Sequence, residues 1–406
     1  MKLGAPLKQL SQKDVTKTIL ASLISIICGL CLGALIVLIV ALTSDNITPK
    51  AGLDGIKLVF FGVFCTGRNA LGELTFGFSS TNWGNLMFRA IPILMTGLSV
   101  AIANKTGLFN IGAPGQYLMG TVGSLYVALS LDTSVIPAWI VWTLAFLAGM
   151  LLGALWGCIP GILKAFRGMN EVLACIMTNW IAANLATMAF ANSALRNAEE
   201  AGKIGYIKPT IRNGVATAKM GLDKIFPNSQ VNGGILVAIL FAVLVYILLT
   251  KTTLGYELRA CGSNRHAARY AGINDKRNIV LSMAIAGALA GGGSALYWLS
   301  GNTEFFWSTY QSLPSAGFNG IPVALLAVNN PLGVIFAALF MSLLEISGQM
   351  LKTFTPYNEY ITDVIISAIV YLSAFSLVIR LWLTGRKKKA AAAPVAENKP
   401  EGGENA

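Results

Sequence analysis

The chain has 406 residues, of which 55% are hydrophobic and only 12% are charged. Its mean hydropathy is +0.65, whereas soluble domains carry about 25% charged residues. So few charges cannot cover the surface of a soluble fold, so the composition excludes soluble proteins and predicts a polytopic integral membrane protein. The 42 glycines are typical of closely packed membrane helices.

The formal net charge of +12 comes from 30 Lys and Arg against 18 Asp and Glu. The basic residues lie mainly in short stretches between apolar runs, which indicates anchoring at the cytoplasmic face of a bilayer rather than nucleic-acid binding. The only histidine is His266. A histidine metal site or a Ser-His-Asp triad inside the membrane is therefore disfavoured, and neither a metal nor another cofactor is expected.

The first apolar run, 19–42, carries no charge and is long enough to cross a hydrocarbon core of about 30 Å. Four lysines precede it, which predicts a cytoplasmic, basic N-terminal segment over residues 1–18. A signal peptide is the alternative interpretation. The run is too long for its hydrophobic region, however, and no A-x-A cleavage site follows.

Nine further crossings are expected at 86–103, 111–131, 138–163, 170–191, 234–250, 279–299, 316–329, 331–351 and 361–383. The short 54–67 segment is expected to be an interfacial or partly inserted helix. The prediction is therefore an all-α polytopic membrane protein with about ten transmembrane helices, some of them broken, in a membrane domain over 19–384.

Alternation of sides along the chain makes 192–233 an extracytoplasmic loop and 251–278 a cytoplasmic loop. The 192–233 loop is basic, which the positive-inside rule does not favour. The opposite assignment would expose both the Arg-Lys-Lys-Lys tail at 386–389 and the more basic 251–278 loop. Residues 385–406 are rich in Ala, Lys and Glu and are predicted to form a disordered cytoplasmic tail.

Two strings suggest that the membrane domain consists of two pseudo-repeated halves. GLFNIGAPGQ (107–116) and SAGFNGIPVA (315–324) both place Phe-Asn beside glycine and proline, where a membrane helix should break. Broken helices in corresponding halves are typical of the midplane site of a transporter. A chance similarity of short glycine-rich strings is the alternative.

Amides dominate the polar side chains within the apolar runs. They both donate and accept hydrogen bonds, so they suit a neutral polar ligand with hydroxyls and ring nitrogens, and aromatic neighbours such as Tyr117 add stacking faces. For each single Asn, a hydrogen bond between helices is the alternative role. The candidate substrate-path residues are Phe109, Asn110, Gln116, Asn170, Glu171, Asn179, Phe318 and Asn319.

Two charged residues, Arg89 and Glu345, lie in or near apolar runs, where charge is unfavourable. Glu345 is flanked by Leu344 and Ile346 and is expected to pair or to be protonated, with a proton relay as an alternative role. Arg89 lies near the start of a run, so its guanidinium is expected to extend toward the membrane surface.

The 251–278 loop holds six basic and two acidic residues. Gly262 and Gly272 bracket a short stretch that is expected to be helical and that contains the small residues Ala267 and Ala268. Such a helix fits closely into a groove of a partner, with Arg259 helping to orient it. The alternative is a solvated basic loop that only sets topology. No G-x-x-x-x-G-K-[ST] string occurs, so the chain itself is not expected to hydrolyse nucleotide.

Three strings carry a family resemblance in a consistent order: GLFNIGAPGQYLMG (107–120), RGMNEVLACIMTNWIA (167–182) and GYELRACGSNRHAARYAGI (255–273). They resemble permease subunits of bacterial ABC importers in the branched-chain amino acid/ribose-type superfamily, and their nucleoside or simple-sugar branch in particular. The resemblance covers roughly 85–385. It implies a non-enzymatic, multi-pass subunit of the bacterial plasma membrane that forms the translocation path for a neutral polar solute, a nucleoside or a simple sugar.

The resemblance also implies partners: a separate ABC ATPase subunit, a second homologous permease subunit in a heterodimer, a substrate-binding lipoprotein and membrane lipid, but no nucleic acid. Both termini are expected to be cytoplasmic. By the same resemblance, 255–273 meets the ATPase. Its coupling residues are then Gly255, Arg259, Gly262, Asn264, Ala267, Ala268 and Gly272.

Two positions depart from the family pattern. Pro114 stands where the family usually has Glu, and Thr178 stands where it has an apolar residue. Phe109, Asn110 and Gln116 are therefore matched to the family without an acid at 114. An ion-gradient-driven secondary transporter of a similar solute is the alternative function, and a membrane-embedded enzyme would need clustered His, Asp or Cys, which the chain lacks.

Overall fold

The computed structural model describes residues 27–374 except 45, 46, 198, 201, 204, 310 and 359. The predicted N-terminal segment 1–18, the tail 385–406 and the outer ends of the first and last predicted crossings lie outside these residues. The described part is mostly helical, and six of its helices are long and apolar enough to cross a membrane. The prediction of a mostly helical membrane protein is therefore confirmed, while the total of about ten crossings stays a prediction.

The elements follow one another in chain order. The first described helix is Ile27–Thr43. It is followed by α2 Pro49–Phe61, the 3-10 turn η1 Gly62–Phe64, the strands β1 Cys65–Arg68 and β2 Leu74–Phe76, α3 Ser80–Lys105, α4 Ala113–Ser130, α5 Ala138–Arg167, α6 Glu171–Ala191, η2 Thr210–Asn213, α7 Leu222–Ile225, α8 Gly234–Lys251, α9 Thr253–Ser263, α10 Arg265–Tyr270, α11 Asp275–Trp298, α12 Ser315–Leu326, α13 Pro331–Phe354 and α14 Tyr360–Ala374. Every predicted crossing between 86 and 351 coincides with one of these helices.

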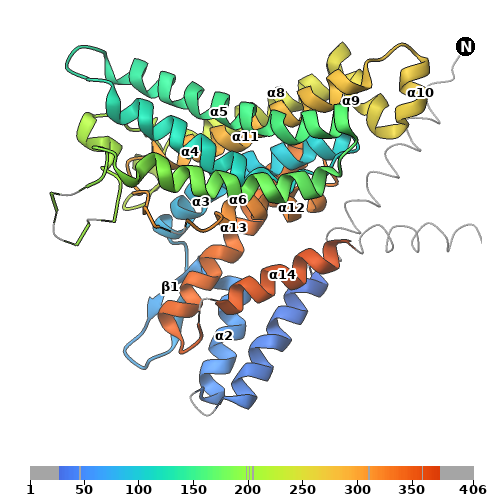
Figure 1. Cartoon of the computed structure of the whole chain (residues 1–406). Helices are drawn as coiled ribbons and strands as arrows, with labels where there is room; N and C mark the ends of the chain where they lie inside the picture. Colours follow the sequence, from blue (N-terminus) through green and yellow to red (C-terminus); the bar gives the residue numbers. More distant parts are fainter. Residues whose placement is uncertain are drawn as a thin grey trace, which may run out of the picture.

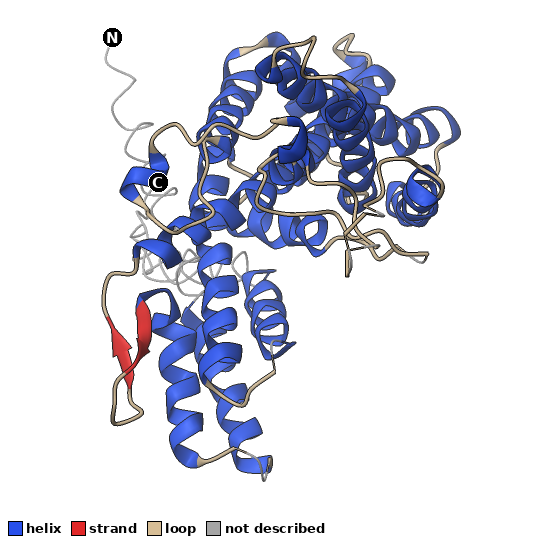
Figure 2. Cartoon of the chain, turned by 90° about the vertical axis from the view of Figure 1, so that its left-hand side faces the viewer, coloured by secondary structure: helices blue, strands red, loops and turns tan. Residues whose placement is uncertain are grey.

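The helices form two groups (Figures 1 and 2). The larger group contains α3 to α6 and α8 to α12, while the helix Ile27–Thr43, α2 and α14 lie beside the far end of α13 below it. One apolar core runs through both, because Val37, Leu94 and Ile365 belong to the same cluster of buried side chains. The long helix α13 joins the two groups.

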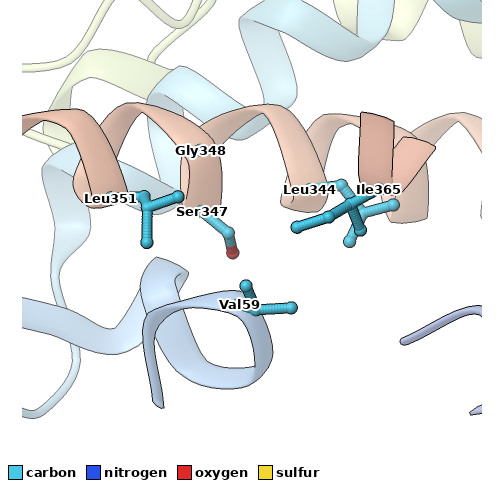
Figure 3. A pocket seen from close by; sticks show the side chains of 6 residues that line it. All are labelled: Val59, Leu344, Ser347, Gly348, Leu351 and Ile365. Atoms are coloured by element: carbon cyan, nitrogen blue, oxygen red, sulfur yellow. The ribbon is translucent and has the colours of Figure 1, made fainter. Parts of the chain in front are cut away.

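The smaller group is closely packed. Where α2, α13 and α14 meet, the void between them has a volume of only about 10 Å³, room for about one water molecule (Figure 3). The side chain of Val59 on α2 faces Ser347 on α13 across this void. No ligand-sized space is therefore present between these three helices.

A short antiparallel hairpin, β1–β2, follows α2. The predicted 54–67 helix is therefore wrong at its C-terminal end, because the chain turns at Gly62 and is extended from Cys65. Arg68 holds the hairpin in place. Its Nη2 pairs with Asp54 Oδ2 of α2 at 3.0 Å and donates to the carbonyl oxygen of Phe354 at the end of α13 at 2.6 Å.

Glycines set the closest helix contact of the larger group, which we call the glycine contact: Gly149 and Gly153 of α5 against Gly287 and Gly291 of α11. A Cβ atom on Gly291 would overlap the backbone oxygen of Gly149, and one on Gly153 would overlap that of Gly287. The two backbones touch because these positions have no side chain, as expected for membrane helices packed through small residues.

The two Phe-Asn strings have different local structures. Residues 106–112 form a non-helical segment between α3 and α4, as predicted. Residues 315–324, by contrast, lie inside the continuous helix α12, so the predicted break within this string is wrong. The chain is instead non-helical before it, at 299–309 and 311–314. A membrane helix tolerates an internal proline such as Pro322 because neighbouring groups compensate for the missing backbone bond.

The N-terminal ends of α4 and α12 meet inside the bundle. A Cβ on Gly317 would lie 2.5 Å from the Cα of Pro114, so the two segments touch backbone to backbone. Both also contact the middle of α3: Thr96 Oγ1 donates to the Ala316 carbonyl oxygen at 2.8 Å, and Asn110 Nδ2 donates to Ser99 Oγ at 3.0 Å. The two strings are thus neighbours in space, while the pseudo-repeat of the halves stays a prediction.

Candidate functional site

A cavity of about 920 Å³ lies where α3, α4, α11, α12, α13 and α14 converge. Ligand pockets have volumes of about 300–1,000 Å³, so this one accommodates a small solute. Its lining includes Phe88, Arg89, Pro92 and Ile93 of α3, Tyr117 of α4, Tyr297 and Trp298 of α11, Ser315, Ala316 and Asn319 of α12, Glu345, Gln349, Lys352 and Thr353 of α13, and Tyr360, Asp363 and Ile366 of α14.

One wall of the cavity is aromatic. Phe88 and Tyr297 stack with ring centroids 5.3 Å apart and planes 19° apart, and Trp298 meets Tyr297 edge to face at 4.9 Å. Tyr117 is 2% exposed and lines the same space. Within the described residues, the buried Trp298 Nε1 has no hydrogen-bond partner. This wall offers ring faces to the cavity, whereas the N–H group of Trp298 is buried.

Another part of the lining is a polar network across three helices. Asn319 Nδ2 of α12 donates to Glu345 Oε1 of α13 at 3.0 Å, and Arg89 Nη2 of α3 donates to Gln349 Oε1 at 3.0 Å. Arg89 Nη1 and Glu345 Oε2 are 3.9 Å apart and form an ion pair. The charge on Glu345 is therefore compensated by Arg89, and amide groups flank the pair.

Three predicted path residues, Asn110, Gln116 and Asn179, lie outside the cavity lining. Their side chains form hydrogen bonds in and around the non-helical 106–112 segment. Asn110 is fully buried and forms two hydrogen bonds with Gln116. Its Nδ2 donates to Gln116 Oε1 at 2.9 Å, and its Oδ1 accepts from Gln116 Nε2 at 3.1 Å. Asn179 accepts from the Gly115 N–H and donates to the Ile111 carbonyl oxygen, both at 2.9 Å. These amides hold the non-helical segment against α6 and α3, so their place in the substrate path stays a prediction.

The other predicted path residues are dispersed. Asn170 caps the N-terminus of α6 by accepting from the Val172 N–H, and Glu171 pairs with Lys164 at 2.8 Å. Phe109 is half-buried and Phe318 is exposed. Of the eight predicted path residues, only Asn319 lines the cavity.

Sequence reasoning did not select Tyr297, Gln349 or Asp363 for the site. The signal that pointed here was the pair of charges in apolar runs, Arg89 and Glu345, which the structure brings together. Arg89 faces the cavity rather than extending to the membrane surface as expected. The aromatic wall carried no such signal, because aromatic residues are common in apolar helices.

The predicted coupling segment consists of α9 and α10, which project from one end of the bundle in Figure 1. The helical stretch expected between Gly262 and Gly272 is confirmed as α10. Asn264 caps α10 by accepting from the Ala267 N–H at 3.0 Å. Three of the predicted coupling residues face the chain itself: Cβ atoms on Gly255 and Gly262 would overlap backbone atoms, and Ala268 is only 4% exposed.

The outward surface of this segment is different. Arg259, Ala267 and Gly272 are exposed, Gly272 in a left-handed turn with φ of 81°. Tyr270, at the end of α10, is 94% exposed. These residues, rather than the buried Gly255 and Ala268, are therefore available to a partner.

The 192–233 segment lies at the other end of the long helices (Figure 1). There it pairs with the 299–309 loop through a bridge between Tyr206 and Phe306 and an ion pair between Lys203 and Glu304 at 2.7 Å. The hydrogen bond with Glu304 raises the pKa of the Lys203 amine. Gln230 connects this segment to the cavity, which it lines.

Residues 82–374 match the protein family described as "Branched-chain amino acid transport system / permease component". The chain belongs to this permease family. The matched region contains α3 to α14 and thus every helix that lines the cavity.

Three relatives are similar over much of the permease. "Guanosine ABC transporter permease protein NupP" of Bacillus subtilis (strain 168) is 34% identical over 92% of this chain and 98% of its own length. "Nucleoside ABC transporter permease protein NupB" of Lactococcus lactis subsp. cremoris is 36% identical over 95% and 98%. "Glucose ABC transporter permease protein TsgB13" of Haloferax volcanii is 32% identical over 66% and 69%.

The permease is accordingly a multi-pass membrane subunit of an ABC importer. It is not an enzyme itself, because ATP hydrolysis in an ABC importer belongs to a separate ATPase subunit. Membership in this family implies an ATPase and a substrate-binding protein as partners. The secondary-transporter alternative is thereby excluded.

Proposed function

We propose that this permease forms the translocation path for a nucleoside and that the 920 Å³ cavity is its binding site. The observation that carries the proposal is that one cavity is lined both by a stacked aromatic pair and by amide and charged groups. The names of NupP and NupB, which are guanosine and nucleoside permeases, point to the same solute class.

Each wall has a distinct task in this proposal. A planar base stacks on the Tyr297 ring, which Phe88 supports from behind. Asn319 and Gln349 then contact the hydroxyls and ring nitrogens of the ligand, which amides can serve as donors and acceptors. The ion pair of Arg89 with Glu345 orients these amides through the hydrogen bonds described above.

A simple sugar is the second candidate, supported by the similarity to TsgB13, which is named a glucose permease. Sugar hydroxyls also suit the amide wall. The discriminating feature is the aromatic wall, which offers a planar base a full ring-to-ring stack.

Protection from chemical labelling tests the site. In the assembled importer without its native cysteines, a Ser315→Cys thiol faces the cavity and should react with a small thiol reagent; a nucleoside should slow this reaction and glucose should not. Ser134→Cys, in an exposed loop away from the cavity, is the control and should show no protection. Protection by glucose alone would favour the sugar, and protection by neither solute would contradict the site.

The assembly is part of the proposal. The permease pairs with a second, homologous permease. This chain itself crosses the membrane about ten times, with both termini in the cytoplasm. The 192–233 segment then faces the binding protein, since Gln230 of this segment lines the cavity. The α9–α10 segment, at the opposite end of the bundle, contacts the ATPase.

The coupling role is tested at an exposed position of α10. Ala267→Glu adds a carboxylate to the surface offered to the ATPase, so it should abolish the stimulation of ATP hydrolysis by the loaded binding protein. Ala267→Ser should retain that stimulation. Ala268 is unsuitable for this test because it is buried against the chain itself. Wild-type stimulation in Ala267→Glu would indicate a loop that only sets topology.

A further inference from the structure

The outward faces of three spanning helices differ in composition. The exposed large side chains of α8 are aliphatic throughout: Leu236, Leu240, Val243, Leu244 and Ile247. The middle of α6 exposes the aliphatic residues Ile176 and Leu185 and, beside them, a different set, Met177, Trp180, Ile181, Asn184 and Met188, which we call the α6 face. On α5 the exposed aromatic residues Trp139 and Phe166 lie at the two ends, with aliphatic residues between them.

The position of Trp180 does not fit a lipid-facing helix. Tryptophans that contact lipid gather at the two membrane–water interfaces, as Trp139 does at the start of α5. Trp180 instead lies near the middle of α6 and is 55% exposed. In protein interfaces, by contrast, Trp and Met are enriched.

Asn184 lies one turn further along on the same face. Its Nδ2 donates to the Trp180 carbonyl oxygen at 2.9 Å, and the side chain is otherwise exposed. An amide directed into hydrocarbon is unfavourable, and asparagines in membrane helices typically bond to a neighbouring helix. The α6 face therefore carries a polar group whose natural partner is another helix.

We propose that the α6 face is the surface on which the second, homologous permease packs. This rests on the permease pair of the proposed function and adds to it the contact surface. The partner must itself lie in the membrane, because the α6 face belongs to an apolar spanning helix; an ATPase or a binding protein outside the bilayer cannot reach it. α6 packs on α4 and α5 with its opposite side, so nothing in the described chain covers the α6 face.

Photo-crosslinking in the intact importer tests this surface. A benzophenone side chain at Met177, which is 57% exposed, should give a product that contains this chain and the homologous permease of its host. The matched control is Leu240 on α8, 55% exposed, which should react only with lipid. Lipid adducts alone at 177, a product from 240 instead, or a product with another copy of this chain would each overturn the proposal.

Substitution provides a second measurement that needs no crosslinker. Asn184→Leu keeps α6 apolar but removes the amide, so the two permeases should associate about threefold less tightly, the effect of losing one interhelical hydrogen bond. Leu240→Ala should leave association unchanged. If the permeases co-purify normally in Asn184→Leu and crosslink only elsewhere, the proposed contact surface is wrong but the proposed permease pair is retained. If the wild-type permeases never co-purify, the proposed pair itself is wrong.

Discussion

The helix α11 takes part in two contrasting regions of the molecule. At Gly287 and Gly291 its backbone touches that of α5, leaving no space between the helices. Two turns later, Tyr297 and Trp298 of the same helix line a cavity of about 920 Å³. In the first region the helices touch because the contacting residues have no side chains. In the second region large aromatic and polar side chains line an open space.

The glycine contact and the cavity are expected to have different roles. A backbone-to-backbone contact has no freedom to adapt, because any added atom must push two whole helices apart. Side chains around a cavity can instead change rotamer or exchange hydrogen-bond partners. We therefore expect changes at the glycine contact to affect folding and changes at the cavity to affect transport.

The largest effect is expected at the glycine contact. In Gly291→Val, the new side chain overlaps the backbone oxygen of Gly149, so the protein should lose about 3 kcal/mol of stability or more. The yield of folded protein in detergent and its thermal unfolding measure this loss. Gly292→Ala is the adjacent control: its Cβ meets only methionine side chains, at 3.1 Å from Met150 Cγ and 3.2 Å from Met95 Cε, and these can adjust, so stability should be near normal. Equal stability of the two variants would contradict the rigid contact.

The next largest effect is expected at Asn110. Substitution here shows whether its amide stabilises the fold or contacts the substrate. Asn110→Leu leaves buried partners on Gln116 and Ser99 unpaired, and each costs about 1–3 kcal/mol. Thermal unfolding should therefore show a destabilised protein, with uptake lost in proportion to the folded fraction. Wild-type stability combined with abolished uptake would instead place Asn110 in the substrate path.

A smaller and more selective effect is expected at Asn319. Asn319→Leu removes the amide that faces the cavity, while Glu345 keeps its ion pair with Arg89. Folding and partner assembly should persist, and nucleoside uptake by the reconstituted importer should fall about tenfold or more, the equivalent of one lost ligand hydrogen bond in a buried site. Normal uptake would remove Asn319 from the site.

The smallest effect is expected from Tyr297→Phe, which keeps the ring stacked on Phe88 and removes only the hydroxyl. Uptake should change by less than about threefold, whereas Tyr297→Ala should lose roughly two- to tenfold, since an aromatic pair contributes about 0.5–1.5 kcal/mol. The ratio of the uptake rates of the two variants measures the contribution of ring stacking. Equal losses would show that the hydroxyl, and not the ring, contacts the solute.

Much of the helical framework could be predicted from sequence. The apolar runs between 86 and 351 coincide with helices, because a spanning segment must satisfy its own backbone hydrogen bonds and a helix does so locally. Prediction failed at residues 54–67 and 315–324, where turn residues had to be interpreted without knowledge of their neighbours. In α12, contacts with α3 and α4 stabilise a helix that proline and glycine alone would disfavour.

The candidate site was only partly predictable. Arg89 and Glu345 could be singled out because charge in an apolar run requires a partner. Asn110, Asn179 and Asn319 could not be distinguished from one another by type or by hydropathy. The first two bond to the chain within and around the 106–112 segment, and the third faces a cavity that α3, α12 and α13 create together.

Composition, hydropathy and the three family strings by themselves determined that this protein is a multi-helical membrane permease, because these properties depend on residue types and on local spacing. Only the tertiary structure decided which side of each helix faces the cavity, the bundle or the outside. That choice depends on contacts between residues as far apart as Arg89 and Glu345, whose pairing no local pattern encodes. The same holds for the exposed Trp180 and Asn184, whose significance appears only once the rest of the chain is seen to leave them uncovered.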